Sequence, residues 1–229
     1  MLGTYAHVHS SNIMKKRYEH SGIPETDAMR IERLLFQASV ARRGRSAIPS
    51  PAVSCGPTAI DESDPERVAY QILEDVLTSD LGASVNCAAY LTRAVSLQHM
   101  AIPSLNVLQT SIHAVDLAPL AGRGLAVAIC ELMYHAGGGA IYAGPVDLQL
   151  AVGVDGSHLV VGLVANGGVH PVASASATAA MMRAIDMVSA LRGQFVRVYE
   201  PARTTFAILL PYREVAAKSP KVRAGRGRH

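Results

Sequence analysis

Two apolar segments of strand length, residues 145–154 and 157–165, are separated only by the Asp155-Gly156 dipeptide. The first segment has an apolar side chain at every second position, which is typical of a half-buried strand. The second is almost wholly apolar and predicts a more fully buried strand. Asp-Gly favours a tight hairpin turn, so the two strands should pair antiparallel. The apolar face of such a sheet must be covered, and this requirement constrains the rest of the chain.

The other apolar patterns in the second half of the chain predict both helices and strands. Residues 125–136 are apolar over a length that suits a buried helix, and residues 177–191 place apolar side chains on one helix face. Residues 107–115 fit a strand, and residues 195–200 and 204–212 fit a closing strand hairpin. This order predicts an α+β fold, an α/β two-layer sandwich in which helices cover one face of an antiparallel sheet.

The first half of the chain is helical in pattern. Apolar residues between Asp27 and Arg43 follow helical spacing, and a second amphipathic pattern covers residues 66–79. The segment between them, residues 44–66, carries four prolines and two glycines and predicts a linker. Two amphipathic helices cannot enclose a core alone, so we expect a helical hairpin that pairs with a second copy as a four-helix bundle. Residues 88–100 add a further helix.

Composition excludes several classes of protein. Of the 229 residues, 49% are hydrophobic and 17% charged, which gives enough apolar surface for a folded core and excludes a disordered chain. No apolar run reaches the roughly 20 residues of a membrane-spanning helix, and the N-terminal segment lacks the apolar stretch of a secretory signal. The three cysteines are too far apart for a disulfide framework or a zinc pattern. We therefore expect a cytoplasmic protein without a membrane span.

Positive charge is concentrated at the C-terminus. Residues 213–229 contain six Lys/Arg and one acid, whereas the rest of the chain has slightly more acidic than basic residues. The segment Lys218–His229 has no apolar periodicity and predicts a disordered tail, which either solubilises the protein or makes weak contacts with a polyanion. With three Phe and no Trp in the chain, an aromatic platform for nucleic acid is not expected.

Four segments, in this order, resemble the cytoplasmic core of a sensor histidine kinase, in particular of the HWE and HisKA_2 subgroups. Residues 65–95 resemble the second helix of the kinase's dimerising hairpin and its link to the next domain. LAVAICELMYHAGGGA (125–140) resembles the family pattern E-L-x-x-N-A-x-x-H-A. LVVGLVANGGVHP (159–171) falls where the family has a strand ending in D-N-G-x-G. Residues 178–212 match the family's closing helix and hairpin.

The resemblance covers residues 26–212 and implies how the chain is divided. It implies a helical hairpin for dimerisation (26–100) and an ATP-binding domain of the gyrase/Hsp90/histidine kinase type (101–212). Outside it, the lack of apolar periodicity predicts a flexible N-terminus (1–25) and a basic disordered tail (213–229). In such a kinase, phosphate moves from Mg-ATP to a histidine on the hairpin.

The acceptor position departs from the family pattern. The family motif begins H-R-x-K-N-x-L, and the best ungapped match, MRIERLL, places Met29 at the histidine position. A thioether has no displaceable proton and no anionic form, so it cannot accept a phosphoryl group. Glu32 and Arg33 replace the basic and amide positions of the motif. His20, upstream of the helix, is the alternative acceptor.

Two nucleotide-binding positions also depart from the pattern. The family's Mg²⁺-coordinating asparagine corresponds to His135, a poor ligand for a hard cation, although the acid four residues earlier is retained as Glu131. These two side chains share a helix face, but no third metal ligand is evident. The aspartate that binds the adenine amino group corresponds to Ala165, and loss of that acceptor costs about 1–3 kcal/mol.

The segments around the phosphates are altered as well. Asn166, Gly167 and Gly168 keep the shape of a turn after the strand but offer no carboxylate. No glycine occurs between Gly168 and Gly193, whereas the family has a glycine-rich lid there whose backbone N–H groups approach the phosphates.

Phosphoryl transfer needs the acceptor, the metal ligand and the lid together. We therefore expect a catalytically degenerate kinase-like protein with no cofactor. It would bind a signalling protein, such as a response-regulator receiver, through the exposed face of its first helix, including Arg30, Glu32 and Arg33. The alternative is an active histidine kinase or histidine phosphotransferase that uses Mg-ATP, or a phosphorylated receiver, with a non-standard acceptor such as His20.

Overall fold

The structure is a computed structural model, and it describes residues 25–46, 65–138, 145–167, 174–200 and 202–217. Several sequence predictions lie outside these residues: most of the flexible N-terminus, with His20, most of the linker after the first helix, Gly168, the segment at the lid position and Lys218–His229 of the tail. The predicted tail and linker were too long. Arg213–Val215 belong to a short final helix in which Val215 is buried, and residues 44–46 belong to the first helix.

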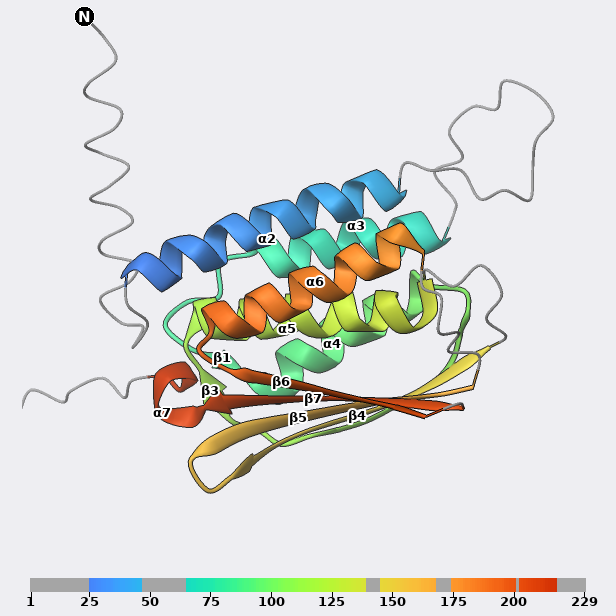
Figure 1. The fold of residues 1–229 in the computed structure, drawn as a ribbon. Coiled ribbons are helices and arrows are strands. Elements are labelled where there is room, and N and C mark those ends of the chain that lie inside the picture. Colours follow the sequence, from blue (N-terminus) through green and yellow to red (C-terminus); the bar gives the residue numbers. More distant parts are fainter. Residues whose placement is uncertain (1–24, 47–64, 139–144, 168–173, 201, 218–229) are drawn as a thin grey trace, which may run out of the picture.

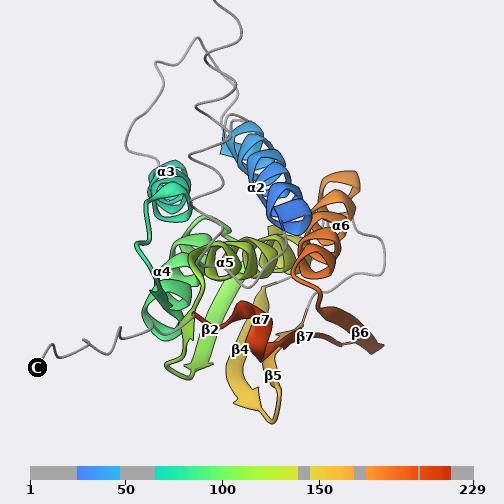
Figure 2. The same ribbon diagram turned by 90° about the vertical axis from the view of Figure 1, so that its left-hand side faces the viewer.

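Helices are stacked in two layers over one face of a sheet (Figures 1 and 2). The outer layer contains α2 (Glu25–Ser46) and α3 (Pro65–Thr78), which run in opposite directions. The inner layer contains α4 (Cys87–Met100), α5 (Pro119–Met133) and α6 (Ala175–Ala190). The short elements are β1 (Val85–Asn86), β3 (Asp116–Leu117), the π-helical turn η1 (Tyr134–Gly138) and α7 (Tyr212–Val215).

The sheet has five strands in the order β2-β4-β5-β7-β6. They are β2 (Leu105–Ile112), β4 (Val146–Asp155), β5 (His158–Asn166), β6 (Gln194–Glu200) and β7 (Arg203–Pro211). The last four strands pair antiparallel, but β2 pairs parallel with β4. The expectation of a purely antiparallel sheet was therefore wrong at this edge. The chain returns from β2 to β4 through α5, and a helical crossover sets two strands parallel.

The hairpin predicted around Asp155 and Gly156 is confirmed. Gly156 has φ +56°, a left-handed conformation that glycine adopts without strain. Side chains of β4 alternate between buried and exposed over most of the strand, as the pattern predicts. β5 also alternates, so it is less completely buried than its continuous apolar sequence indicated. Its second apolar face, with Val160 and Val164, lies on the side of the sheet away from the helices.

The helical hairpin packs on the sheet domain of its own chain. α2 contacts α5 and α6, and α3 contacts α4 and α5. Buried residues of all five helices and of the sheet belong to one hydrophobic cluster. The need to cover the inner faces of α2 and α3, from which we predicted a four-helix bundle with a second copy, is thus met within one chain. Among the described helices, none has both the length and the apolar character of a bilayer span.

Candidate functional site

The residues at the predicted nucleotide positions converge where the end of α5 lies over strands β5 and β7. Glu131 is in the last turn of α5, and His135 is in the π-helical turn that follows. The ring of His135 stands edge-on to that of Phe206 on β7, with the ring centroids 5.9 Å apart. Ala165 is near the end of β5, which pairs with β7.

His135 is buried and hydrogen-bonded. Its Nδ1 lies 3.0 Å from the carbonyl oxygen of Ala177 on α6, so Nδ1–H donates to that carbonyl. Burial lowers the pKa of His135 from its ordinary value of 6.5, an effect that the hydrogen bond to Ala177 partly opposes. The imidazole is therefore neutral at pH 7, and it links the end of α5 to the beginning of α6.

Glu131 is completely buried, and both of its carboxylate oxygens bind arginine. Arg183 on α6 donates to Oε2 from Nη2 and Nε, at 2.7 and 3.2 Å. Arg42 on α2 donates from Nη1 to Oε1 at 3.4 Å. Charge-assisted hydrogen bonds of this kind are stronger than neutral ones. In this structure the carboxylate holds helices together, rather than facing an open site.

Arg42 extends this network to a fourth helix. Its side chain is only 2% exposed, and it also forms an ion pair with Glu74 on α3. The hydroxyl of Ser39 donates to Glu74 at 2.6 Å. Two arginines and two glutamates thus alternate across α3, α2, α5 and α6, and their formal charges cancel. No local sequence pattern predicts this network, because its hydrogen-bonded partners lie 32 to 89 residues apart along the chain.

The end of β5 keeps the shape of a turn without an acidic group. Ala165 is completely buried, and Asn166 is half-buried. Gly167 has φ +85°, and a Cβ atom there would lie 2.9 Å from the carbonyl oxygen of Pro145. Glycine is therefore required for the close approach of these two segments. Gly168 lies outside the described residues.

Thr204 is a polar residue of this region that the sequence analysis missed. It lies opposite Ala165 in the β5–β7 pairing, is 1% exposed, and its hydroxyl has no hydrogen-bond partner among the described residues. Only the pairing register of β5 and β7 shows that Thr204 lies beside Ala165. In the sequence alone, Thr204 is an ordinary threonine in a strand pattern.

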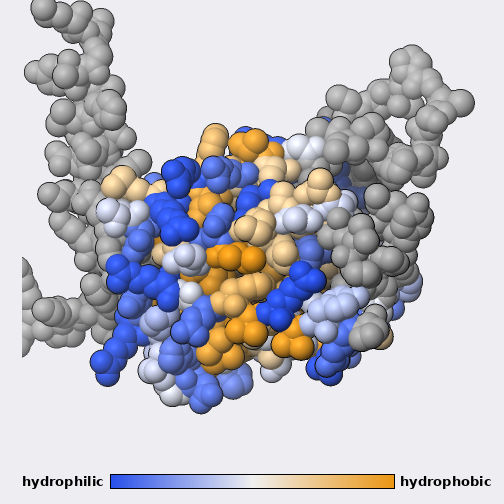
Figure 3. Space-filling model, viewed as in Figure 1, coloured by the Kyte–Doolittle hydropathy of each residue, from blue (hydrophilic) through white to orange (hydrophobic). Residues whose placement is uncertain are grey.

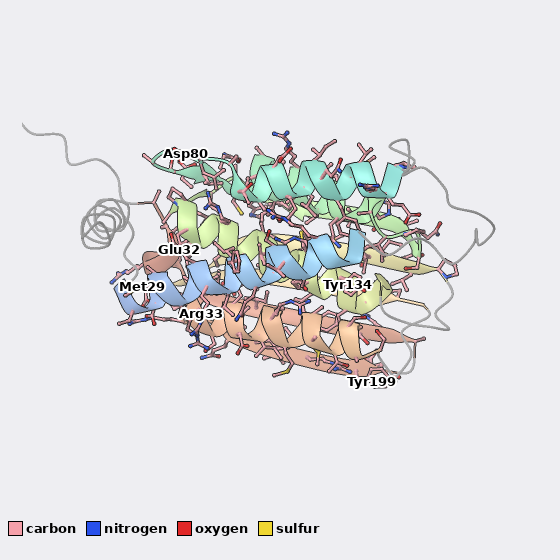
Figure 4. All side chains as sticks on the ribbon, turned by 90° about the horizontal axis from the view of Figure 1, so that it is seen from above. Met29, Glu32, Arg33, Asp80, Tyr134 and Tyr199 are labelled. Carbon is pink, nitrogen blue, oxygen red and sulfur yellow. The ribbon has the colours of Figure 1, made fainter. Side chains whose placement is uncertain are left out.

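The predicted acceptor and partner-binding residues lie elsewhere, on the first half of α2. Figure 4 shows Met29 and Tyr134, which follows α5, near opposite ends of the helical layers. Met29 is 49% exposed. Arg33 is exposed and Glu32 half-buried, while Arg30 lies 3.9 Å from the carboxylate of Asp186 on α6. The structure therefore does not bring the two predicted sites together.

α2 also exposes a row of apolar side chains that the sequence analysis did not single out. Met29, Phe36 and Val40 are 49%, 69% and 52% exposed. We call these three residues the outer stripe. Their spacings of seven and four place them on one side of the helix, away from buried Ile31 and Leu34.

Cavities lie between α2 and α3, beside the buried charge network. One of about 350 Å³ is lined mainly by polar and charged side chains, among them Arg43, Arg67 and Asp75. Another of about 200 Å³ is lined in part by Phe36 and Leu77. The helical hairpin thus offers a partly apolar surface with arginines at its edge.

The described residues provide no cluster of three or more His, Cys, Asp or Glu side chains that could hold a metal ion. Cys87 and Cys130 are buried, and neither forms a disulfide among the described residues. Burial raises the pKa of Cys87 to about 11, so this thiol is protonated at neutral pH and unreactive.

No family model matches the sequence, and no curated protein matches it significantly. Solved structures do. The histidine kinase domain of the blue-light-activated histidine kinase EL346 from Erythrobacter litoralis is 16% identical with a TM-score of 0.51, and the match covers 82% of this chain and 94% of that chain.

This chain has a histidine kinase fold. A histidine kinase from Burkholderia phymatum STM815 also matches over 86% of this chain and all of that one, at 13% identity and a TM-score of 0.46. AdeS, a histidine kinase from Acinetobacter baumannii, matches over 63% of this chain and 75% of that one, at 12% identity and a TM-score of 0.41. The mixed sheet with helices on one face agrees with the fold class predicted from the sequence.

Proposed function

We propose that this protein is a catalytically degenerate relative of the HWE and HisKA_2 histidine kinases. It acts in the cytoplasm, in two-component-type signalling, by binding a protein partner such as a response-regulator receiver. The observation that carries the proposal is the state of Glu131. This carboxylate is buried and both of its oxygens bind arginine, Arg42 and Arg183, so it faces the helices instead of an open nucleotide site.

The neighbouring positions support the loss of nucleotide chemistry. His135 is neutral, buried and hydrogen-bonded to α6, and Mg²⁺ prefers oxygen ligands. Ala165 offers no acceptor for an adenine amino group. If two such losses each remove about 3 kcal/mol of transition-state stabilisation, the rate falls by about four orders of magnitude. Met29 cannot accept a phosphoryl group in any case.

The partner surface that we propose is the exposed side of α2. The outer stripe supplies apolar contacts, and Arg30, Glu32 and Arg33 supply charges close to it. An apolar centre with arginine at its border is typical of binding surfaces. A homodimer through α2 and α3 would use the same surface, because the inner sides of both helices are covered within the chain.

Thermal unfolding of the full chain with and without Mg-ATP tests the loss of nucleotide binding. A ligand present at 100 times its Kd stabilises a protein by about 2.7 kcal/mol, so a functional site would raise the Tm by several degrees. We expect no shift. The matched control is the double variant His135→Asn/Ala165→Asp, which restores two family side chains.

Incubation with labelled ATP, or with a phosphorylated receiver, tests for phosphoryl transfer directly. We expect no label on the protein. An acid-labile label on His20 or on another histidine would overturn the proposal in favour of an active kinase or phosphotransferase.

A further inference from the structure

The smaller of the two cavities in the helical layers, about 200 Å³ in volume, lies where α2 and α3 meet α5. Figure 2 shows α5 below and between the two outer helices. In Figure 3, hydrophobic side chains gather on the upper rim of the molecule over α2, the helix in which Phe36 is 69% exposed. The apolar wall of the cavity consists of Leu35, Phe36, Leu77 and Val127. Phe36 therefore belongs both to this cavity and to the outer stripe.

The charges that line this cavity are all positive. They belong to Arg42, Arg43 and Arg123, and none of the described residues that line the cavity is acidic. Arg42 is balanced by the buried network, through its ion pairs with Glu74 and Glu131. An apolar cavity with an excess of positive charge favours an anionic ligand that has an apolar body.

The larger cavity, of about 350 Å³, has a different lining. Arg42 and Arg43 also contribute to it, but there the arginines are accompanied by two acidic side chains, Glu74 and Asp75. Its charges are therefore of both signs. The difference in lining, more than the difference in size, makes the smaller cavity the one suited to an anion.

Arg123, on α5, is a cation without an acidic partner among the described residues. Its side chain is half-buried. Its Nη2 donates to the carbonyl oxygen of Ser79 at 2.6 Å, and the side chain also forms a hydrogen bond with Tyr90. Burial raises the pKa of Tyr90 to about 12, so this phenol is neutral at pH 7. Nε of Arg123 is buried and has no hydrogen-bond partner in the part of the chain that the structure describes.

A carboxylate would complete this arrangement. A half-buried guanidinium without an anionic partner is unfavourable, because burial removes water from the charge. A carboxylate would supply the missing negative charge and would accept hydrogen bonds from the guanidinium. An apolar cavity of about 150 Å³ can hold one benzene molecule, so the smaller cavity has room for a single ring and its carboxylate.

We propose that the smaller cavity binds a small monocarboxylic acid whose apolar body is about the size of one ring. The body contacts Leu35, Leu77 and Val127, and the carboxylate accepts hydrogen bonds from Arg123. This site goes beyond the proposed function and does not depend on it, because it requires neither a nucleotide nor a protein partner. The two proposals can therefore fail separately.

Benzoate is the probe, and NMR spectra of the ¹⁵N-labelled full chain measure its binding. A ligand with so few atoms binds weakly, so we expect saturable shifts with a Kd of about 0.1–1 mM. Benzyl alcohol has the ring without the charge, and acetate has the charge without the ring. Each should bind at least about tenfold more weakly than benzoate. No saturable shift with benzoate up to about 20 mM, or an equal affinity for benzyl alcohol, would overturn the proposal.

Substitution of Arg123 tests the residue itself. Arg123→Met keeps an unbranched side chain and removes the charge, so the Kd for benzoate should rise at least about tenfold. The matched control is Arg67→Met, which removes an arginine that lines only the larger cavity and should bind benzoate like the wild type. Circular dichroism establishes that each variant is folded. Unchanged affinity in Arg123→Met, or an equal loss in Arg67→Met, would contradict the proposal.

The Nε–H signal of Arg123 gives a measurement in the wild type that does not require Arg123→Met to fold. The signal is assigned by its absence from Arg123→Lys. It should move when benzoate is added and stay in place when benzyl alcohol is added, because only a carboxylate pairs with the guanidinium. A signal that benzoate leaves in place would show that Arg123 does not hold the acid.

Discussion

The two sides of helix α2 carry similar residues in different surroundings. Its inner side, with Ile31 and Arg42, is buried against other helices of the chain, whereas the outer stripe of Met29, Phe36 and Val40 is exposed. Apolar residues therefore occur around the whole helix, and its amphipathic character is weak. We therefore expect the inner side to contribute to stability and, under the proposed function, the outer side to bind the partner. Substitutions on each side of the helix test this distinction.

Removing Arg42 should cause the largest loss of stability. Its side chain lies between Glu74 and Glu131, and Arg42→Met would leave two acidic groups with one cation fewer in the interior. Breaking a buried ion pair in this way costs about 3–5 kcal/mol. Urea unfolding measures the loss. Arg43→Met, at an exposed position next in sequence, should change stability by less than about 1 kcal/mol. Equal losses in the two variants would show that the buried network does not stabilise the fold.

Truncating an inner aliphatic residue should have the next largest effect. Ile31 is completely buried, so Ile31→Ala should destabilise the protein by about 2–5 kcal/mol through lost burial and a cavity. The matched change on the outer side is Val40→Ala, at a side chain 52% exposed, which should cost less than about 0.5 kcal/mol. Chemical unfolding of both variants under one condition gives the comparison. A large loss from Val40→Ala would mean that the outer side is covered in solution.

Local sequence patterns predicted most of the elements, because periodicity and turn chemistry act over a few residues. Examples are the hairpin at Asp155 and Gly156 and the two helices of the outer layer, α2 and α3. The features that local patterns could not predict depend on contacts between residues distant in sequence. The bonds from Arg42 and Arg183 to Glu131 span 89 and 52 residues, and the parallel pairing of β2 depends on the path of α5.

The candidate site shows the same limit. A resemblance in sequence pointed to Glu131, His135 and Ala165, and the structure places all three in one region. The resemblance did not indicate that two arginines would bind Glu131. A retained acid in a sequence motif looks the same whether its carboxylate is exposed or bound to arginine. Thr204 was missed because its neighbour Ala165 is on another strand.

Changing the outer stripe should affect binding more than stability. Phe36 is 69% exposed, and Phe36→Ala should weaken binding of a receiver domain about tenfold or more, which corresponds to about 1.4 kcal/mol. Isothermal titration of purified receiver domains measures this change, and thermal unfolding should show little difference from the wild type. Leu34→Ala, on the inner side, should reduce stability instead. Unchanged affinity in Phe36→Ala, for a receiver that binds the wild type, would remove the outer stripe from the partner surface.

The smallest expected effect is the contribution of His135 to the pH dependence of stability. Burial lowers the pKa of His135 in the folded protein below its ordinary value of 6.5, so the unfolded chain binds this proton more readily. The contribution of His135 to stability should be complete above about pH 6.5 and should decrease as the pH falls toward the lower pKa of the folded state. Because the hydrogen bond to Ala177 opposes part of the shift in pKa, the loss of stability should be smaller than the losses expected for the other variants.

Urea unfolding of the wild type and of His135→Gln between pH 7.5 and 5 isolates this contribution, since glutamine does not titrate. If stability falls equally in both proteins, other groups cause the pH dependence, and His135 is not held neutral by its burial between α5 and α6.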